Sequence, residues 1–187
     1  MEITLIRHGR SAHIGETQMT ISDFRIWVEM YNSNGINKNE ACPPEAIEMV
    51  KSAPLLITSD LKRSIQSARL LNPGAKIKEY PLFRETELPA PAGGLMAMKL
   101  KPNSWAVLLR IAWFCGYSFR CESYRDAKVR AKHAALKLIA CASEYNSAIL
   151  VGHGFFNLLI AKELQKMGWK GKRKTGSTHW NVATYKY

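Results

Sequence analysis

Short apolar runs alternate with longer amphipathic segments along this chain, and that alternation is the feature that most restricts its fold. The apolar runs at residues 3–6, 54–58 and 148–151 have the length and composition of buried strands. Helical patterns lie between them, the longest over residues 122–142, where small and apolar residues recur every three or four positions. Strands that alternate with helices predict an α/β three-layer sandwich with a mainly parallel central sheet.

The remaining segments complete this pattern within one domain. Further strands are predicted at residues 76–80 and 181–187, and further helices at 24–31, 43–52, 61–71 and 155–167. We expect Ser59 or Asp60 to cap the helix at 61–71. A length of 187 residues fits a single domain over residues 1–187, with a candidate cap region at 89–120. In that region, residues 105–114 are apolar enough for a helix or a lid.

The net charge of +12 indicates an anionic partner: nucleic acid, anionic lipid or a phosphorylated small molecule. The densest basic run, in which only Trp169 is large and apolar, is either a solvated loop or a polyanion-binding patch. Aromatic side chains do not alternate with the bases, and this argues against nucleic acid as the partner. The run consists of Lys170, Lys172, Arg173 and Lys174.

Cysteine spacing and hydropathy predict a cytoplasmic protein without membrane segments. The four cysteines form no CxxC pair and have no histidine at metal-ligand spacing, so we expect reduced thiols and no zinc site. The apolar stretch at the N-terminus is too short for a signal peptide. Residues 105–119 are interrupted by Arg110 and fall short of the roughly 20 residues that span a bilayer.

Three of the predicted strands end in polar residues suited to phosphate binding. They end in Arg-His-Gly at residues 7–9, Thr-Ser-Asp at 58–60 with Arg63 just beyond, and Gly-His-Gly at 152–154. The carboxyl ends of parallel strands meet at one edge of a sheet, where ligands bind. Each histidine alone could be structural, and each arginine could be a surface residue. Together, cationic side chains and free helix N–H groups predict a phosphate pocket.

These segments resemble the blocks of the histidine phosphatase superfamily, also called the phosphoglycerate mutase-like family. The opening block is Leu-Ile-Arg-His-Gly-Arg-Ser at residues 5–11, and the second is Thr-Ser-Asp-Leu-Lys-Arg-Ser at 58–64. Leu-Phe-Arg-Glu at 82–85 is similar to the acid block, and Leu-Val-Gly-His-Gly at 150–154 to the closing block. The resemblance spans residues 3 to about 165 in the family order, and implies the family's fold.

The resemblance also implies roles for individual residues. His8 would be the nucleophile that forms a phosphohistidine, and Glu85 the general acid and base. Phosphoryl oxygens would be held by Arg7, Arg63, His153 and Ser11. No metal or other cofactor is implied, because arginines and histidines offset the charge of the transition state. Glu87 is the alternative acid, since on a strand it would face the same side as Glu85.

Departures from the family pattern favour a phosphatase acting on a small phosphorylated substrate, with water as acceptor. Residues 86–94 lack the Gly-x-Trp-Glu-Gly stretch that the mutases carry, and the chain is short for a mutase. Ile14 stands where the family often has asparagine, and Arg10 where it has Glu or Gln. The alternatives are a phosphohistidine-protein phosphatase, a phosphoglycerate mutase-like phosphotransferase and a catalytically silent anion-binding module.

Two further sets of residues have open roles. The apolar residues of the candidate cap either select the leaving group or belong to an ordinary core-packing helix. We assign no chemical role to His13, His133 or His179. The cap residues are Met96, Met98, Trp105, Trp113, Phe114 and Phe119.

Overall fold

The computed structural model describes residues 1–37, 39–90, 98–172, 175–176 and 178–187. Within these ranges, six strands form one sheet in the order β3-β2-β4-β1-β6-β5. β3, β2, β4 and β1 are parallel, whereas β6 is antiparallel to both β1 and β5. The strands are β1 (Glu2–Arg7), β2 (Leu55–Thr58), β3 (Lys76–Glu79), β4 (Ser147–Gly152), β5 (Lys170–Gly171) and β6 (Val182–Lys186).

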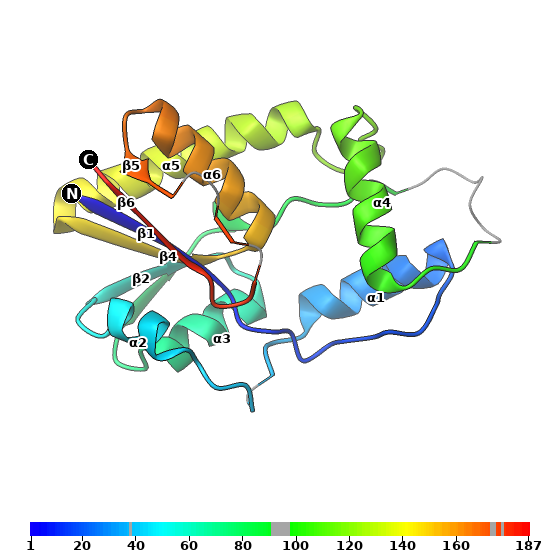
Figure 1. Ribbon diagram of the computed structural model, residues 1–187, viewed down its shortest axis with the longest axis horizontal. Helices are drawn as coiled ribbons and strands as arrows, with labels where there is room; N and C mark the ends of the chain where they lie inside the picture. The colour runs from blue at the N-terminus through cyan, green and yellow to red at the C-terminus, as the bar shows by residue number, and fades with distance from the viewer. Residues whose placement is uncertain (38, 91–97, 173–174, 177) are drawn as a thin grey trace.

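Helices cover both faces of this sheet, which confirms the predicted three-layer α/β sandwich. Helices α2 and α3 lie against one face, and α5 and α6 against the other (Figure 1). The helices are α1 (Ile21–Ser33), α2 (Pro44–Val50), α3 (Lys62–Leu71), α4 (Pro102–Phe114), α5 (Tyr124–Tyr145) and α6 (Gly154–Lys166), with a 3₁₀ turn η1 (Pro81–Phe83).

The central strands supply apolar side chains to both faces alternately, as the two-residue repeat of a strand requires. In β1, Ile3 and Leu5 join the core beneath α5 and α6, while Ile6 joins the core on the opposite face. All three are at most 1% exposed. Complete burial of such a side chain stabilises a fold by roughly 1.5–3 kcal/mol. Burial on both faces therefore fixes the register, and with it the edge at which the strands end.

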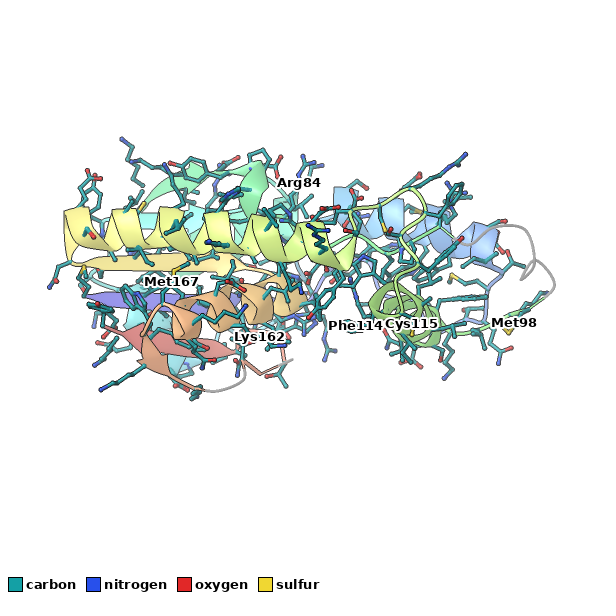
Figure 2. The ribbon with its side chains drawn as sticks, turned by 90° about the horizontal axis from the view of Figure 1, so that it is seen from above. Arg84, Met98, Phe114, Cys115, Lys162 and Met167 are labelled. Carbon is teal, nitrogen blue, oxygen red and sulfur yellow. The ribbon has the colours of Figure 1, made fainter. Side chains whose placement is uncertain are left out.

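Helices α1 and α4 pack together beyond the carboxyl ends of the strands. Their shared core contains Ile21, Phe24, Trp105 and Leu109, and Trp105 Nε1 donates to Met19 O at 2.8 Å. Figure 2 shows this pair from above, at the end of the molecule that carries Cys115 and Met98 and away from Met167. Residues far apart in the sequence thus form one side of the space that faces the strand ends.

The apolar residues of the candidate cap region differ from one another in their placement. Trp105 and Trp113 are buried in the core, so the core-packing alternative is correct for these two. Phe114 and Phe119 are exposed and do not line the cleft described below. Met96 lies outside the described residues. An amphipathic pattern identifies the helix but leaves open which neighbour covers its apolar face.

Three local expectations need correction. Helix α3 begins at Lys62 without a side-chain cap, because Ser59 contacts His153 and Asp60 pairs with Arg84. Helix α1 begins at Ile21, where Thr20 and the third helical residue form a capping box. Part of the basic run forms strand β5 instead of a loop, since Gly171 pairs with β6. Arg173 and Lys174 lie outside the described residues.

Among the helices of the described residues, none has the length and apolar character needed to cross a membrane. All four cysteines are free thiols: Cys42, Cys115, Cys121 and Cys141. The free thiols agree with the expectation from their spacing, and the cytoplasmic location remains a prediction.

Candidate active site

The ends of β1, β2 and β4 bring the polar segments together as predicted. Arg7 pairs with Gly152 in the register of β1 and β4, so the residues that follow both strands emerge side by side. His8 N donates to Gly152 O at 3.0 Å, which continues the pairing by one residue. The rings of His8 and His153 consequently lie with centroids 5.1 Å apart.

His8 is buried as a neutral imidazole with one nitrogen available. Its Nδ1 lies 2.7 Å from Gly9 O, and because a carbonyl only accepts, the ring proton is on Nδ1. Nε2 therefore keeps its lone pair, which accepts from Arg63 Nε at 3.2 Å. Burial holds the pKa of His8 well below its usual value of 6.5, and the Arg63 charge lowers it further. This is the protonation state that a nitrogen nucleophile requires.

The His153 ring contacts its protein partner through Nε2. Ser59 Oγ accepts from Leu61 N at 3.3 Å and lies 2.7 Å from His153 Nε2. If the hydroxyl donates to Nε2, the ring proton is on Nδ1. Nδ1 is buried and has no hydrogen-bond partner in the described residues. A buried donor without an acceptor costs about 1–3 kcal/mol, so an oxygen of a bound ligand would be favoured there.

Arg63 stands in the first turn of α3 and is only 2% exposed. Its Nε donates to His8, and its Nη1 donates to Asn32 Oδ1 at 3.1 Å and to Tyr31 O at 3.4 Å. Among the described residues, Nη2 has no hydrogen-bond partner. Burial lowers the pKa of the guanidinium from its ordinary value of 12.5. A buried guanidinium with an unused nitrogen beside His8 is suited to bind a phosphate oxygen.

Arg7 reaches the same cleft from the end of β1. Its side chain passes over Gly154, the first residue of α6. A Cβ at position 154 would lie 3.0 Å from Arg7 Nε, so glycine leaves the room that the guanidinium occupies. Together, Arg7 and Arg63 place two cations around the histidine pair, as the sequence predicts.

Glu85 closes the site at the N-terminus of α6. Its carboxylate accepts hydrogen bonds from Phe155 N at 3.0 Å, Phe156 N at 2.8 Å and Thr86 N at 3.0 Å. Glu87 also lines the cleft but is exposed. This segment is irregular and not a strand, so the alternation that made Glu87 the alternative acid does not apply. Glu85 is the acid that the fold holds near the strand ends.

Arg130 of α5 fixes the segment that carries Glu85. Its Nη1 donates to Leu82 O and Arg84 O, both at 2.9 Å. The same guanidinium pairs with Glu122 and lies 3.8 Å above the centroid of the Phe156 ring. One side chain thereby ties the acid segment to both α5 and α6.

The cleft around these residues has a volume of about 990 Å³ and is lined by arginine. Eight arginines face it together with five glutamates, and no lysine of the described residues does. Guanidinium groups bind phosphate and carboxylate through two parallel hydrogen bonds. Within the same residues, no three His, Cys, Asp or Glu side chains are arranged to hold a metal ion. The arginines are Arg7, Arg10, Arg25, Arg63, Arg84, Arg110, Arg120 and Arg130.

Two histidines without an expected role also line the cleft. His179 Nδ1 lies 3.2 Å from His8 O, with ring centroids 5.5 Å apart. Burial, followed by the Arg7 charge, lowers the pKa of His179. His13 packs against Trp27 at a centroid distance of 5.2 Å. Their placement depends on long-range packing, and no local motif in the sequence indicates it.

The loop after β1 carries two positions that the sequence pattern singles out. Ser11 is buried, but its hydroxyl accepts from His13 N at 3.1 Å and donates to Gly35 O at 3.4 Å. It therefore ties the loop to its neighbour, and phosphate binding by Ser11 remains a prediction. Ile14 lines the cleft with 70% of its surface exposed.

The family model of the histidine phosphatase superfamily (branch 1) matches residues 3–187 of this chain. The chain belongs to this superfamily, and is a phosphatase by class. No curated protein sequence matches it.

Solved structures with the same fold share few of its residues. The product of a Mycobacterium tuberculosis open reading frame is 16% identical with a TM-score of 0.64, over 100% of this chain and 91% of that one. A mycobacterial glucosyl-3-phosphoglycerate phosphatase in complex with VO3 is 20% identical with a TM-score of 0.61, over 98% and 91%. A Thermus thermophilus protein is 20% identical with a TM-score of 0.55, over 98% and 92%.

Proposed function

We propose that this protein is a metal-independent phosphomonoesterase that works through a phosphohistidine on His8. The observation that carries the proposal is the unprotonated Nε2 of His8, held beside the buried guanidinium of Arg63. A neutral nitrogen nucleophile next to a cation with an unused donor fits attack on phosphorus.

In the first step, the phosphate monoester binds between the two arginines and the second histidine. Arg7, Nη2 of Arg63 and Nδ1–H of His153 donate to its non-bridging oxygens. These donors are positioned before substrate arrives, so little reorganisation is needed as charge builds on the phosphoryl oxygens. The bound ester then replaces the hydrogen bond between Arg63 Nε and His8 Nε2, so that the lone pair of Nε2 faces phosphorus.

In the second step, His8 Nε2 attacks phosphorus in line with the ester oxygen. The P–N bond forms as the P–O ester bond breaks, and the leaving oxygen takes the proton of the Glu85 carboxyl, which enters this step protonated. Water then attacks the phosphohistidine while Glu85 takes one proton from it. The P–N bond breaks, and inorganic phosphate leaves with His8 neutral again.

The cleft supports a small phosphorylated substrate as the natural ligand. Its arginines surround the phosphate position and continue over the faces of α1 and α4. A mycobacterial protein of this fold has been solved with inorganic phosphate, which makes phosphate and vanadate suitable probes. Steering by these cations explains part of the net charge of +12 without a nucleic acid partner.

Hydrolysis of p-nitrophenyl phosphate by His8→Ala and by wild type tests the proposal. We expect the variant to lose essentially all activity, and wild type to form an acid-labile phosphoenzyme that His8→Ala does not form. His133→Ala changes an exposed histidine on α5 and serves as the matched control. Activity that survives His8→Ala, or that a chelator abolishes, would contradict the mechanism.

A further inference from the structure

We propose that Asn32 is a phosphate ligand, which donates from its side-chain amide to an oxygen of the bound phosphomonoester. This inference rests on the proposed function, because it concerns the same phosphate. Asn32 stands in the last turn of α1, and its side chain lines the cleft. Asn32 thus comes from the helix pair α1 and α4, and it is distant in sequence from the motifs at the strand ends.

The contact with Arg63 determines how the Asn32 amide is oriented. Arg63 Nη1 lies 3.1 Å from the amide, and a guanidinium can only donate. The atom facing Arg63 is therefore Oδ1, and the two N–H groups of Nδ2 face away from it. No hydrogen bond of Nδ2 occurs in the described residues, so both of these donors are unused.

Arg63 also fixes the distance between this amide and the reacting nitrogen. Its Nε contacts His8 Nε2, and its Nη1 contacts Asn32. The planar guanidinium therefore spans from the nucleophile to the amide, and its remaining nitrogen, Nη2, is bonded to the same central carbon. In the proposed complex, a phosphate that binds Nη2 in front of His8 accepts a further hydrogen bond from Nδ2–H of the neighbouring Asn32 amide.

The end of α1 is held firmly enough to position such a donor. The Arg63 Cζ lies 4.6 Å from the centroid of the Tyr31 ring, a cation–π contact. Tyr31 stacks on Trp27 at 5.3 Å, and Trp27 stacks on Phe24 at 5.9 Å. Phe24 is anchored in the shared core of α1 and α4. This row of rings connects the shared core of α1 and α4 to the guanidinium of Arg63.

The hydrogen bond from Arg63 to Tyr31 O also reduces the repulsion between the C-terminus of α1 and an anion. The last carbonyls of a helix repel an anion, since they carry partial negative charge without an intrahelical partner. Here Tyr31 O accepts from Arg63 Nη1 at 3.4 Å. The end of α1 therefore offers a phosphate an amide donor beside a carbonyl that is already occupied.

A double-mutant cycle with inorganic phosphate tests whether Asn32 binds phosphate itself or acts only by holding Arg63. Phosphate affinity is measured by calorimetry, and vanadate inhibition by hydrolysis of p-nitrophenyl phosphate. The proteins are wild type, Asn32→Ala, Arg63→Ala and the double variant, with Arg63→Lys as a second background that retains the charge. Ser33→Ala changes the next, exposed residue, which does not line the cleft, and is the control.

We expect Asn32→Ala to weaken phosphate binding by about 10-fold to 150-fold in wild type and again in the Arg63 variants, as the loss of one hydrogen bond to a charged group predicts. Unchanged affinity in Asn32→Ala overturns the inference, as does a loss that disappears once Arg63 is replaced. Wild type that binds no phosphate would overturn the proposed function together with this inference. If wild type forms a phosphoenzyme, the proposed function stands and only the Asn32 inference has failed. If it forms none, the proposed function has failed.

Discussion

Ser59 Oγ lies 2.7 Å from Nε2 of His153 in a fully buried contact that joins the end of β2 to the end of β4. The hydroxyl also accepts from Leu61 N, which leaves its own proton free to be donated to the imidazole. If Ser59 donates to Nε2, it fixes the ring proton of His153 on Nδ1, which has no partner in the described residues. In the proposed mechanism it is a positioning residue, because it acts on phosphate only through His153.

Replacing Ser59 by alanine should therefore weaken phosphate binding and catalysis without unfolding the protein. Loss of one buried hydrogen bond costs about 1–3 kcal/mol, which corresponds to a decrease of roughly 5-fold to 150-fold in kcat/KM. Steady-state kinetics with p-nitrophenyl phosphate and vanadate inhibition measure the effect. Without the hydroxyl, His153 is free to adopt the other tautomer, so kcat/KM and vanadate affinity should fall together.

Thr58→Val provides the matched control on the same strand. Thr58 Oγ1 is also buried, but it has no hydrogen-bond partner in the described residues. Valine keeps its shape and removes only the hydroxyl. We expect normal kinetics for this variant; a decrease equal to that of Ser59→Ala would show that any buried hydroxyl in β2 matters and would reject the tautomer argument.

The sequence predicts the strand-end side of the candidate site better than the side formed by α1 and α4. Arg7, His8 and His153 follow parallel strands directly, so the topology alone brings them together. His179 was missed because its place beside His8 depends on the pairing of β6 with β1. Asn32 was missed for a similar reason: the helix predicted at 24–31 ends one residue before it, and only packing of α1 against α4 brings it to Arg63.

Glu85→Gln should separate substrates by the quality of their leaving groups. An alkyl alcohol needs a proton as it leaves, whereas p-nitrophenolate does not. General acid catalysis contributes about 10²-fold to 10⁴-fold, so the ratio of alkyl phosphate to p-nitrophenyl phosphate turnover should fall by at least about 10²-fold. Burst and steady-state kinetics with both substrates measure this ratio.

Glu87→Gln is the control for that experiment, since Glu87 lines the same cleft but is exposed. Its ratio should match that of wild type. A ratio that is insensitive to Glu85→Gln would instead favour phosphohistidine or another phosphoramidate as the substrate. A ratio that falls only in Glu87→Gln would assign the acid to Glu87.

The free energy of unfolding should decrease below about pH 6.5. His8 and His153 both have pKa values held well below 6.5, first by burial and then by neighbouring charges. In the unfolded chain their pKa returns to about 6.5, so the unfolded state binds more protons below that pH. Each histidine then removes up to about 1.4 kcal/mol of stability per pH unit until its folded pKa is reached.

Urea denaturation between about pH 7.5 and about pH 5 measures this dependence. His8→Asn removes one of the histidines with a lowered pKa and should reduce the slope, while His133→Asn changes an exposed histidine for comparison. Equal stability of wild type across the range would contradict the buried, neutral state of both rings.

Arg130→Met should impair proton transfer by Glu85 more than it impairs phosphate binding. Arg130 holds Leu82 O and Arg84 O, and through them the loop that aims Glu85 at the strand ends. Methionine keeps part of the side-chain length but no donor. We expect turnover of alkyl phosphates to fall by about 10-fold or more, with vanadate affinity within about twofold of wild type.

Arg125→Met, an exposed change on the same helix, controls for loss of an arginine from α5. Thermal unfolding of both variants separates a local effect from loss of the fold. Equal losses of alkyl phosphate turnover and vanadate affinity in Arg130→Met would mean that the phosphate pocket itself had moved. The guanidinium would then support the whole site, and the acid loop would not depend on it specifically.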